Sequence, residues 1–248
     1  MIYTIENVKT GEFAIIDGGY SKDSEQIKDI IDKHGKVDIW ILTHFHEDHC
    51  GAFNALWNEY ESKVQKVYIT QFDTDILMNN AQDWDDPDTL SLFKKQTSGN
   101  EKIILLHTGD KMDIIGLNME VFLAGDEEIL KYMINVWNNC SVVFKISGSE
   151  DDMLFLGDLQ NEELGTYLVG RYGETKLHAK YIQASHHGNW GLAVDFYSSL
   201  NPQAVFFDAP EWIMTGEKYS ARFLKEWCDN HNVASYDYSV APTSVTIR

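Results

Sequence analysis

Hydrophobic positions follow two spacings along the chain, one typical of strands and one typical of helices. The apolar runs "EFAIID" at 12–17 and "VDIWILT" at 37–43 predict buried strands. After each run, apolar residues recur every three or four positions, which predicts helices over 21–35 and 52–63. The chain therefore opens with two strand–helix units, and the segment between 43 and 52 is predicted to be a loop that joins a strand to a helix.

Further apolar runs continue this mixture to the end of the chain. Strands are predicted at 67–70, 103–106, 119–123, 141–147, 153–156, 181–184, 204–208 and 244–247, and helices near 127–136, 162–170, 192–200 and 218–230. The most polar stretch, 83–100, is interpreted as a long surface excursion. Because no repeat or linker interrupts the pattern, we expect a single domain over 1–248, of mixed α/β (α+β) class, with layered sheets covered by helices.

Composition narrows the class of partner. The formal charge is −19 at pH 7, and no basic run interrupts it, so a long nucleic acid is not expected as a ligand. The scattered cysteines Cys50, Cys140 and Cys228 match neither a disulfide framework nor a thiolate zinc site, which indicates a reducing compartment. With no membrane-spanning run and no signal-like start, we expect a cytoplasmic protein without membrane contact. The oligomeric state stays open.

Candidate chemistry concentrates in "ILTHFHEDHCG", residues 41–51. His44 and His46 alternate along an extended segment, so their imidazoles can point to one side, and Asp48 and His49 follow after the chain turns. Histidine and aspartate without thiolate suit Zn(II), Mn(II) or Fe(II) and leave coordination positions for water. This loop therefore predicts a metal site with open positions, which is typical of catalysis.

Other strand ends carry residues that can complete such a site. "MLFLGDL" leads an apolar strand into Asp158, where a carboxylate able to bridge two ions is expected. "YIQASHHGNW" leads another strand into His186 and His187. Taken alone, the first pattern favours a plain turn aspartate, and the second is as readily a pair of surface histidines. Together with the first cluster, they favour a second set of ligands.

The chain resembles the metallo-β-lactamase fold superfamily, whose signature His-x-His-x-Asp-His is matched by His44, His46, Asp48 and His49. "AIIDGG", "HTGDKMDIIGLNMEVF" and "LFLGDL" are similar to further segments of that family, in the same order. "YIQASHHGN" with "FYSSLNPQAVFFDA" resembles the branch that includes the hydrolase domain of the competence protein ComEC and phosphorylcholine esterase. The resemblance implies a four-layer αββα sandwich.

The resemblance also implies a set of ligands for two divalent ions, with zinc expected first and manganese or iron as alternatives. One ion would be held by His44, His46 and Asp158. The other would be held by Asp48, His49, Asp158 and His187. His187 is preferred over His186 because it stands directly before Gly188, although the sequence leaves open which ring faces the metal.

Additional residues receive roles beside these ligands. His186 and Asp48 are candidates for a catalytic role, with His186 binding or protonating the substrate. Asp17 resembles a residue of the family that orients a ligand, and its alternative interpretation is a plain turn aspartate. The third histidine that many members place before Asp158 is absent, and Asn138 with Ser141 fits an Asn-x-x-Ser arrangement of the ComEC-like branch.

These observations favour a hydrolase. Two cations that share a carboxylate would activate a bound water and polarise the bond under attack, so no protein nucleophile is required. The resemblance favours a phosphoester or phosphodiester of a small molecule. Alternatives are a carboxyl ester, lactone, thioester or β-lactam hydrolase, and a metal-binding module without catalysis. A flavodiiron-type redox function is disfavoured because His46 stands where those members carry Glu.

Overall fold

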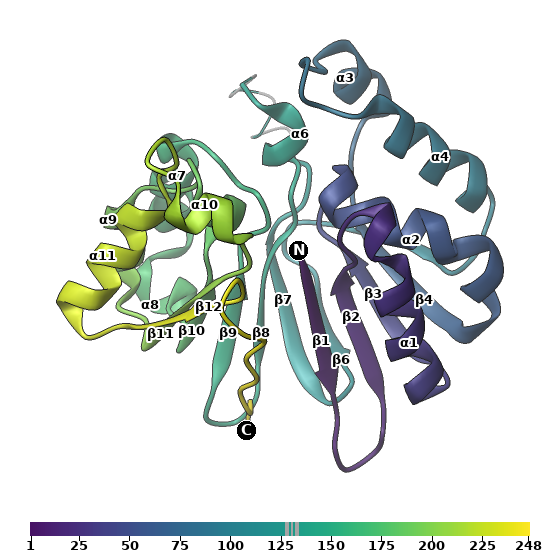
Figure 1. Cartoon of the computed structure of the whole chain (residues 1–248), viewed down its shortest axis with the longest axis horizontal. Coiled ribbons are helices and arrows are strands. Elements are labelled where there is room, and N and C mark those ends of the chain that lie inside the picture. Colours follow the sequence, from purple (N-terminus) through teal and green to yellow (C-terminus); the bar gives the residue numbers. More distant parts are fainter. Residues whose placement is uncertain (127–128, 130, 132–133) are drawn as a thin grey trace.

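Two β-sheets form the centre of the protein and helices cover their outer faces (Figure 1). The structure is a computed structural model that describes residues 1–126, 129, 131 and 134–248. The helix predicted near 127–136 falls largely outside the described residues. Within the described part of the chain, no helix is long and apolar enough to span a membrane.

The first sheet has the order β1-β2-β3-β4-β5, and every neighbouring pair except β1 and β2 is parallel. Its strands are β1 (Ile2–Glu6), β2 (Phe13–Asp17), β3 (Val37–Leu42), β4 (Val64–Thr70) and β5 (Ile103–Leu106). The helices from this half of the chain are α1 (Ser24–His34), α2 (Glu47–Tyr60), α3 (Thr74–Asn79) and α4 (Pro87–Thr97), with 3-10 turns η1 (Ser21–Asp23) and η2 (Glu61–Lys63).

The second sheet has the order β12-β11-β10-β9-β8-β7-β6, parallel from β12 to β9 and antiparallel from β9 to β6. Its strands are β6 (Lys111–Ile114), β7 (Leu117–Leu123), β8 (Val143–Ser147), β9 (Asp152–Phe155), β10 (Tyr181–Gln183), β11 (Ala204–Phe207) and β12 (Ala234–Asp237). The helices are α6 (Val136–Asn139), α7 (Glu162–Tyr172), α8 (Glu174–Leu177), α9 (Val194–Leu200), α10 (Glu211–Thr215) and α11 (Ala221–His231), with the 3-10 turn η3 (Ser185–Gly188).

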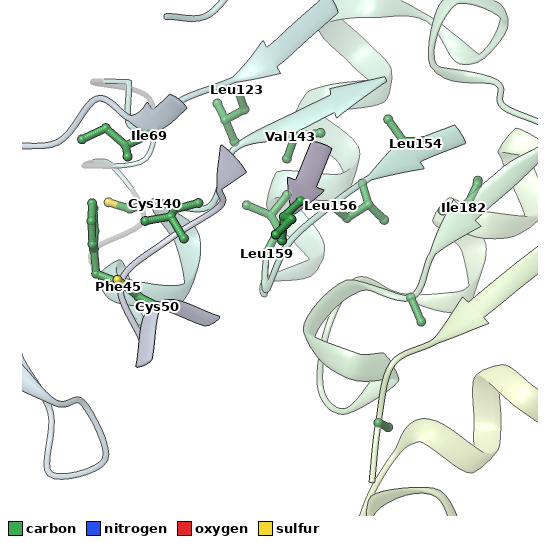
Figure 2. Close-up of a cluster of buried hydrophobic side chains, with 14 of the residues drawn as sticks. Phe45, Cys50, Ile69, Leu123, Cys140, Val143, Leu154, Leu156, Leu159 and Ile182 are labelled. Atoms are coloured by element: carbon green, nitrogen blue, oxygen red, sulfur yellow. The ribbon is translucent and has the colours of Figure 1, made fainter. Parts of the chain in front are cut away.

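Alternating side chains on each strand explain the four layers. In β3, Ile39 and Ile41 belong to the cluster between the sheets, whereas Trp40 and Leu42 belong to the cluster under the helices. Because successive strand residues point to opposite faces, a strand buried on both faces reads as a continuous apolar run. Figure 2 shows part of the helix-side cluster, where Leu154 and Ile182 of the second sheet lie in the same buried region as Phe45. The predicted αββα sandwich is confirmed.

The chain departs from the predicted elements in several places, which include the unpredicted strands β1 and β12. Residues 83–100 contain α4, whose Leu90 and Phe93 are buried, so this stretch is a packed helix as well as a surface excursion. Helix α2 begins at Glu47, so Asp48 lies in its first turn rather than in a loop. The strand predicted at 244–247 is wrong: in this fully described segment the chain is extended but joins neither sheet.

Candidate metal centre

The predicted site residues converge because both sheets direct strand ends to one edge. Within each sheet, the strands that deliver them are parallel to one another, β2 to β3 and β9 to β10 and β11, and parallel strands place their carboxyl ends at the same edge of a sheet. β2 ends at Asp17 and β3 leads into His44, while β9 leads into Asp158, β10 into His187 and β11 into Asp208.

Four of the predicted ligands form one compact group. Asp48, His49, Asp158 and His187 each offer an atom within 4.8 Å of the others. His187 Nε2 lies 3.1 Å from Asp48 Oδ2 and 3.3 Å from Asp158 Oδ2. Two ligand atoms about 2.1 Å from one tetrahedral zinc lie about 3.4 Å apart, so these separations match a shared cation.

The remaining two predicted ligands lie beside this group. His44 Nε2 is 3.2 Å from His46 Nδ1 and 3.9 Å from Asp158 Oδ2. Asp158 thus contacts both groups, since its Oδ1 lies 3.2 Å from His49 Nε2. The arrangement can hold one cation between His44, His46 and Asp158 and a second one in the four-residue group, with the Asp158 carboxylate between them.

Two buried atoms test whether a cation fits here. His49 Nε2 and Asp158 Oδ1 have no hydrogen-bond partner among the described residues, although they lie 3.2 Å apart. An unsatisfied buried polar atom costs about 1–3 kcal/mol. A divalent cation between the two atoms would coordinate both, so the residues present fit a metal site.

Asp17 orients one of these imidazoles. Its buried carboxylate accepts hydrogen bonds from the Thr43 backbone N–H at 2.7 Å and the Thr43 hydroxyl at 2.8 Å, and it lies 2.8 Å from His49 Nδ1. A carboxylate is only an acceptor, so in its neutral form the His49 ring carries its N–H on Nδ1 and turns the bare Nε2 toward Asp48 and Asp158. The structure therefore places Asp17 beside His49, and its role in orienting a metal ligand stays a prediction.

Asp208 has the same relation to His187, and the sequence reasoning gave it no role. Its Oδ1 lies 2.9 Å from His187 Nδ1, and its Oδ2 accepts a hydrogen bond from the Tyr3 hydroxyl at 3.1 Å. This contact leaves Nε2 of His187 to face Asp48. Because Asp208 directly follows β11, the rule that singled out Asp158 after β9 would also have found it.

The electrostatics of the chain alone pair protonated imidazoles with carboxylates. Burial lowers the pKa of His49, but the carboxylates, led by Asp158 and Asp17, outweigh it and raise that pKa to about 9. Burial also opposes protonation of His187, yet Asp158 raises its pKa well above the usual range. Conversely, burial favours a neutral Asp158, while His187 and His49 hold its pKa well below the usual range. A bound cation would take the place of these protons.

Backbone geometry aims the strand-end residues. Gly157 has a φ of +54°, and a Cβ atom there would lie 2.6 Å from Ser141 Cβ, so glycine is required before Asp158. Ser141 also accepts a hydrogen bond on Oγ from the Asp158 backbone N–H at 2.9 Å. His186 and His187 both have positive φ values, of 50° and 60°. Residues other than glycine with this left-handed backbone conformation destabilise the folded state and are frequent at functional sites.

His186 lies outside the compact group. Its Nε2 is 4.0 Å from Asp158 Oδ2, and its Nδ1 contacts Gln160 Nε2 at 2.6 Å and also the carbonyl oxygen of Asn189. Burial lowers the pKa of His186. Of the two adjacent histidines, the structure therefore brings His187 to the cluster and leaves His186 at its border.

Amide side chains line the region beyond His186. Asn138 is buried and donates from Nδ2 to Gln160 Oε1 at 3.3 Å, while its Oδ1 has no partner among the described residues. Gln160 and the exposed Trp190 help to line a cavity of about 330 Å³. Trp137 is buried and stacks on the His46 ring, with the ring centroids 5.7 Å apart.

Comparison with known proteins agrees with this geometry. The sequence model of the Metallo-beta-lactamase superfamily matches residues 2–71, which include the histidine cluster. Among solved structures, the metallo-beta-lactamase fold protein YhfI from Bacillus subtilis superposes with a TM-score of 0.54 at 9% identity, over 92% of this chain and 84% of that one. The chain has the metallo-β-lactamase fold.

A second structure with this fold is named for a hydroxylase activity. A mutant of the CmlA beta-hydroxylase superposes with a TM-score of 0.55 at 11% identity, over 92% of this chain and 49% of that one, so this chain spans about half its length. No curated protein sequence matches the chain. At these identities the likeness establishes the fold, and the reaction has to be argued from the site.

Proposed function

We propose that the chain is a metal-dependent hydrolase of small phosphoesters or phosphodiesters that uses two divalent cations, zinc before manganese or iron. The observation that carries the proposal is the spacing of the ligand atoms. Nε2 of His187 lies 3.1 Å from Asp48 Oδ2, and Nε2 of His49 lies 3.2 Å from Asp158 Oδ1, and these separations are compatible with ligands on a common ion. Two of these atoms, His49 Nε2 and Asp158 Oδ1, have no hydrogen-bond partner among the described residues, which supports the proposal.

The predicted ligands fall into two sets, one for each cation. His44, His46 and Asp158 would hold one cation, and Asp48, His49, Asp158 and His187 would hold the other. When bound, the cations would activate water near neutral pH and stabilise the charge that develops on the substrate. Asp17 and Asp208 keep the imidazoles of His49 and His187 turned toward this point.

His186 is the residue proposed to protonate the leaving group. Its side chain is 21% exposed, so it is accessible at the border of the site, and its Nε2 lies only 4.0 Å from the shared Asp158 carboxylate. It also contacts Gln160, which lines the amide-rich cavity. A substrate that reaches from the cations into this cavity would pass His186, which could then donate a proton to the departing oxygen.

The preference for phosphoesters rests on the resemblance to the ComEC-like branch. Asn138 and Ser141 occupy the segment in which many members carry a third histidine, and Ser141 holds the backbone of Asp158. The formal charge of −19 disfavours long nucleic acids and supports a small substrate whose phosphate would be bound chiefly by the cations.

The test is turnover by protein purified in metal-depleted buffer and then supplied with Zn(II) or Mn(II). The panel is bis-p-nitrophenyl phosphate, p-nitrophenyl phosphate, a lactone and nitrocefin, with Asp158→Ala as the site variant. Asp229→Asn, on the exposed face of α11, is the matched control. Phosphoester turnover that is lost only in Asp158→Ala supports the proposal. Lactone or nitrocefin turnover would select carboxyl chemistry instead, and binding of metal without any turnover would select a metal-binding module.

A further inference from the structure

We propose that Asp85, from the segment between α3 and α4, is a positioning residue that holds His46 in the ligand tautomer and thereby controls occupancy of the first cation site. The inference rests on the proposed function, because it concerns one of the two cations. In the sequence, Asp85 lies far from every strand end, in the stretch interpreted as a surface excursion.

The contact fixes which nitrogen of His46 carries the proton. His46 Nε2 lies 2.7 Å from Asp85 Oδ1, and His46 Nδ1 lies 3.2 Å from His44 Nε2. Since a carboxylate only accepts, the N–H of the neutral ring sits on Nε2. The lone pair on Nδ1 then faces the His44 side, which is where a cation shared with Asp158 would lie.

Asp85 is itself held rigidly. Its side chain is only 2% exposed, and its second oxygen accepts a hydrogen bond from the Gln82 backbone N–H at 2.7 Å. The Asp85 backbone N–H donates to the Gln82 carbonyl at 3.1 Å, which closes a tight turn. A carboxylate with both oxygens engaged is preorganised, so it can orient the imidazole without losing much side-chain freedom on binding.

The stacking contact on the face of the His46 ring depends on the same segment. The ring is nearly parallel to the Trp137 indole, with an interplanar angle of 8°, and Trp137 Nε1 donates to the Leu77 carbonyl of α3 at 2.9 Å. The segment that carries α3 and Asp85 therefore determines both the hydrogen bond and the stacking partner of His46.

The three orienting carboxylates divide between the two cation sites. Asp17 and Asp208 contact His49 and His187, which belong to the second site, whereas Asp85 contacts only the first. The first site has no third histidine, so a misplaced His46 would leave it with His44 and the shared Asp158. Loss of a carboxylate behind a ligating histidine typically costs 10–100-fold in metal affinity, and here we expect that cost at one cation alone.

The test is a stepwise Zn(II) titration of metal-free protein against a chromophoric chelator, for wild type, Asp85→Ala and Asp208→Ala. Asp86→Ala is the matched control, because Asp86 caps α4 and its hydrogen bonds go to residues of that helix rather than to a histidine. We expect two ions in wild type and in Asp86→Ala. In Asp85→Ala we expect one ion at wild-type affinity and the other weakened by about 10–100-fold. Asp208→Ala should weaken the complementary step.

A second readout needs no metal. In the ¹⁵N spectrum of metal-free wild type, His46 should report the Nε2–H tautomer, and Asp85→Ala should shift it toward a mixture. Unchanged stepwise affinities in Asp85→Ala, equal loss at both steps, or the same loss in Asp86→Ala would each overturn the inference. If wild type binds no cation, the proposed function fails, and the tautomer of His46 still reports whether Asp85 orients it.

Discussion

Replacement of Asp17 by asparagine tests how strongly the buried carboxylate supports the centre. Asp17 is fully buried, and its carboxylate contacts the Thr43 N–H, the Thr43 hydroxyl and His49 Nδ1. Asparagine keeps the shape but turns one acceptor into a donor, which then faces another donor. It also removes the charge that helps to raise the pKa of His49 to about 9.

The expected loss of stability follows from the hydrogen bond and the ion pair that the substitution removes. A hydrogen bond to a charged group contributes about 1.5–3 kcal/mol. Removal of one partner of a buried ion pair costs about 3–5 kcal/mol, because the other partner stays buried without compensation. We therefore expect Asp17→Asn to lower the free energy of unfolding of the metal-free protein by about 3–5 kcal/mol at pH 7.

Urea unfolding in the presence of a chelator measures this loss, with an unchanged m value as the sign that only stability has changed. The control is Asp229→Asn, whose ion pair with Lys225 joins exposed neighbours on α11 and contributes a few tenths of a kcal/mol. A loss below about 1 kcal/mol in Asp17→Asn, similar to a surface substitution, would refute the argument that the carboxylate supports His49.

Three further predictions concern pH, backbone and metal. In metal-free protein, the raised pKa of His49 adds at most about 3 kcal/mol of stability, which is complete below pH 6.5 and is lost as pH rises through about 9. The thermal unfolding temperature should therefore fall over that window. A melting temperature that does not change with pH there would contradict this prediction. Gly157→Ala adds a Cβ atom 2.6 Å from Ser141 Cβ at a positive φ, so we expect the free energy of unfolding in urea to fall by about 2–5 kcal/mol. The control is Gly170→Ala, where the added atom meets nothing within 4 Å. Equal losses in the two variants would contradict the steric argument. Zn(II) at a hundredfold excess over its dissociation constant should stabilise wild type by about 2.7 kcal/mol, and His187→Ala should lose most of this gain; full stabilisation of the variant by zinc would exclude His187 as a ligand.

The sequence predicted the parts of the site that follow strands. His44 and Asp158 could be placed because an apolar run predicts a strand, and the residues just after parallel strands meet at one edge. The same rule was available for Asp208 after β11 and was not applied. The family resemblance supplied the pairing of these segments, which periodicity alone does not contain.

Long-range contacts account for what the sequence did not reveal. Asp85 reaches His46 across 39 positions from a polar turn, and nothing in its local pattern differs from that of the neighbouring aspartates. The predicted strand at 244–247 had the correct alternation, since Val245 and Ile247 pack against the cluster between the sheets. The edge beside β11 is taken by β12 instead, and alternation cannot distinguish a strand that pairs from a tail that only packs.

The most direct test of the central claim is an anomalous X-ray difference map from crystals of metal-free protein soaked in Zn(II). The account predicts two peaks that share Asp158, one beside Asp48, His49 and His187 and the other beside His44 and His46. A map with no peak at these residues, or with zinc bound only at surface carboxylates, would contradict it.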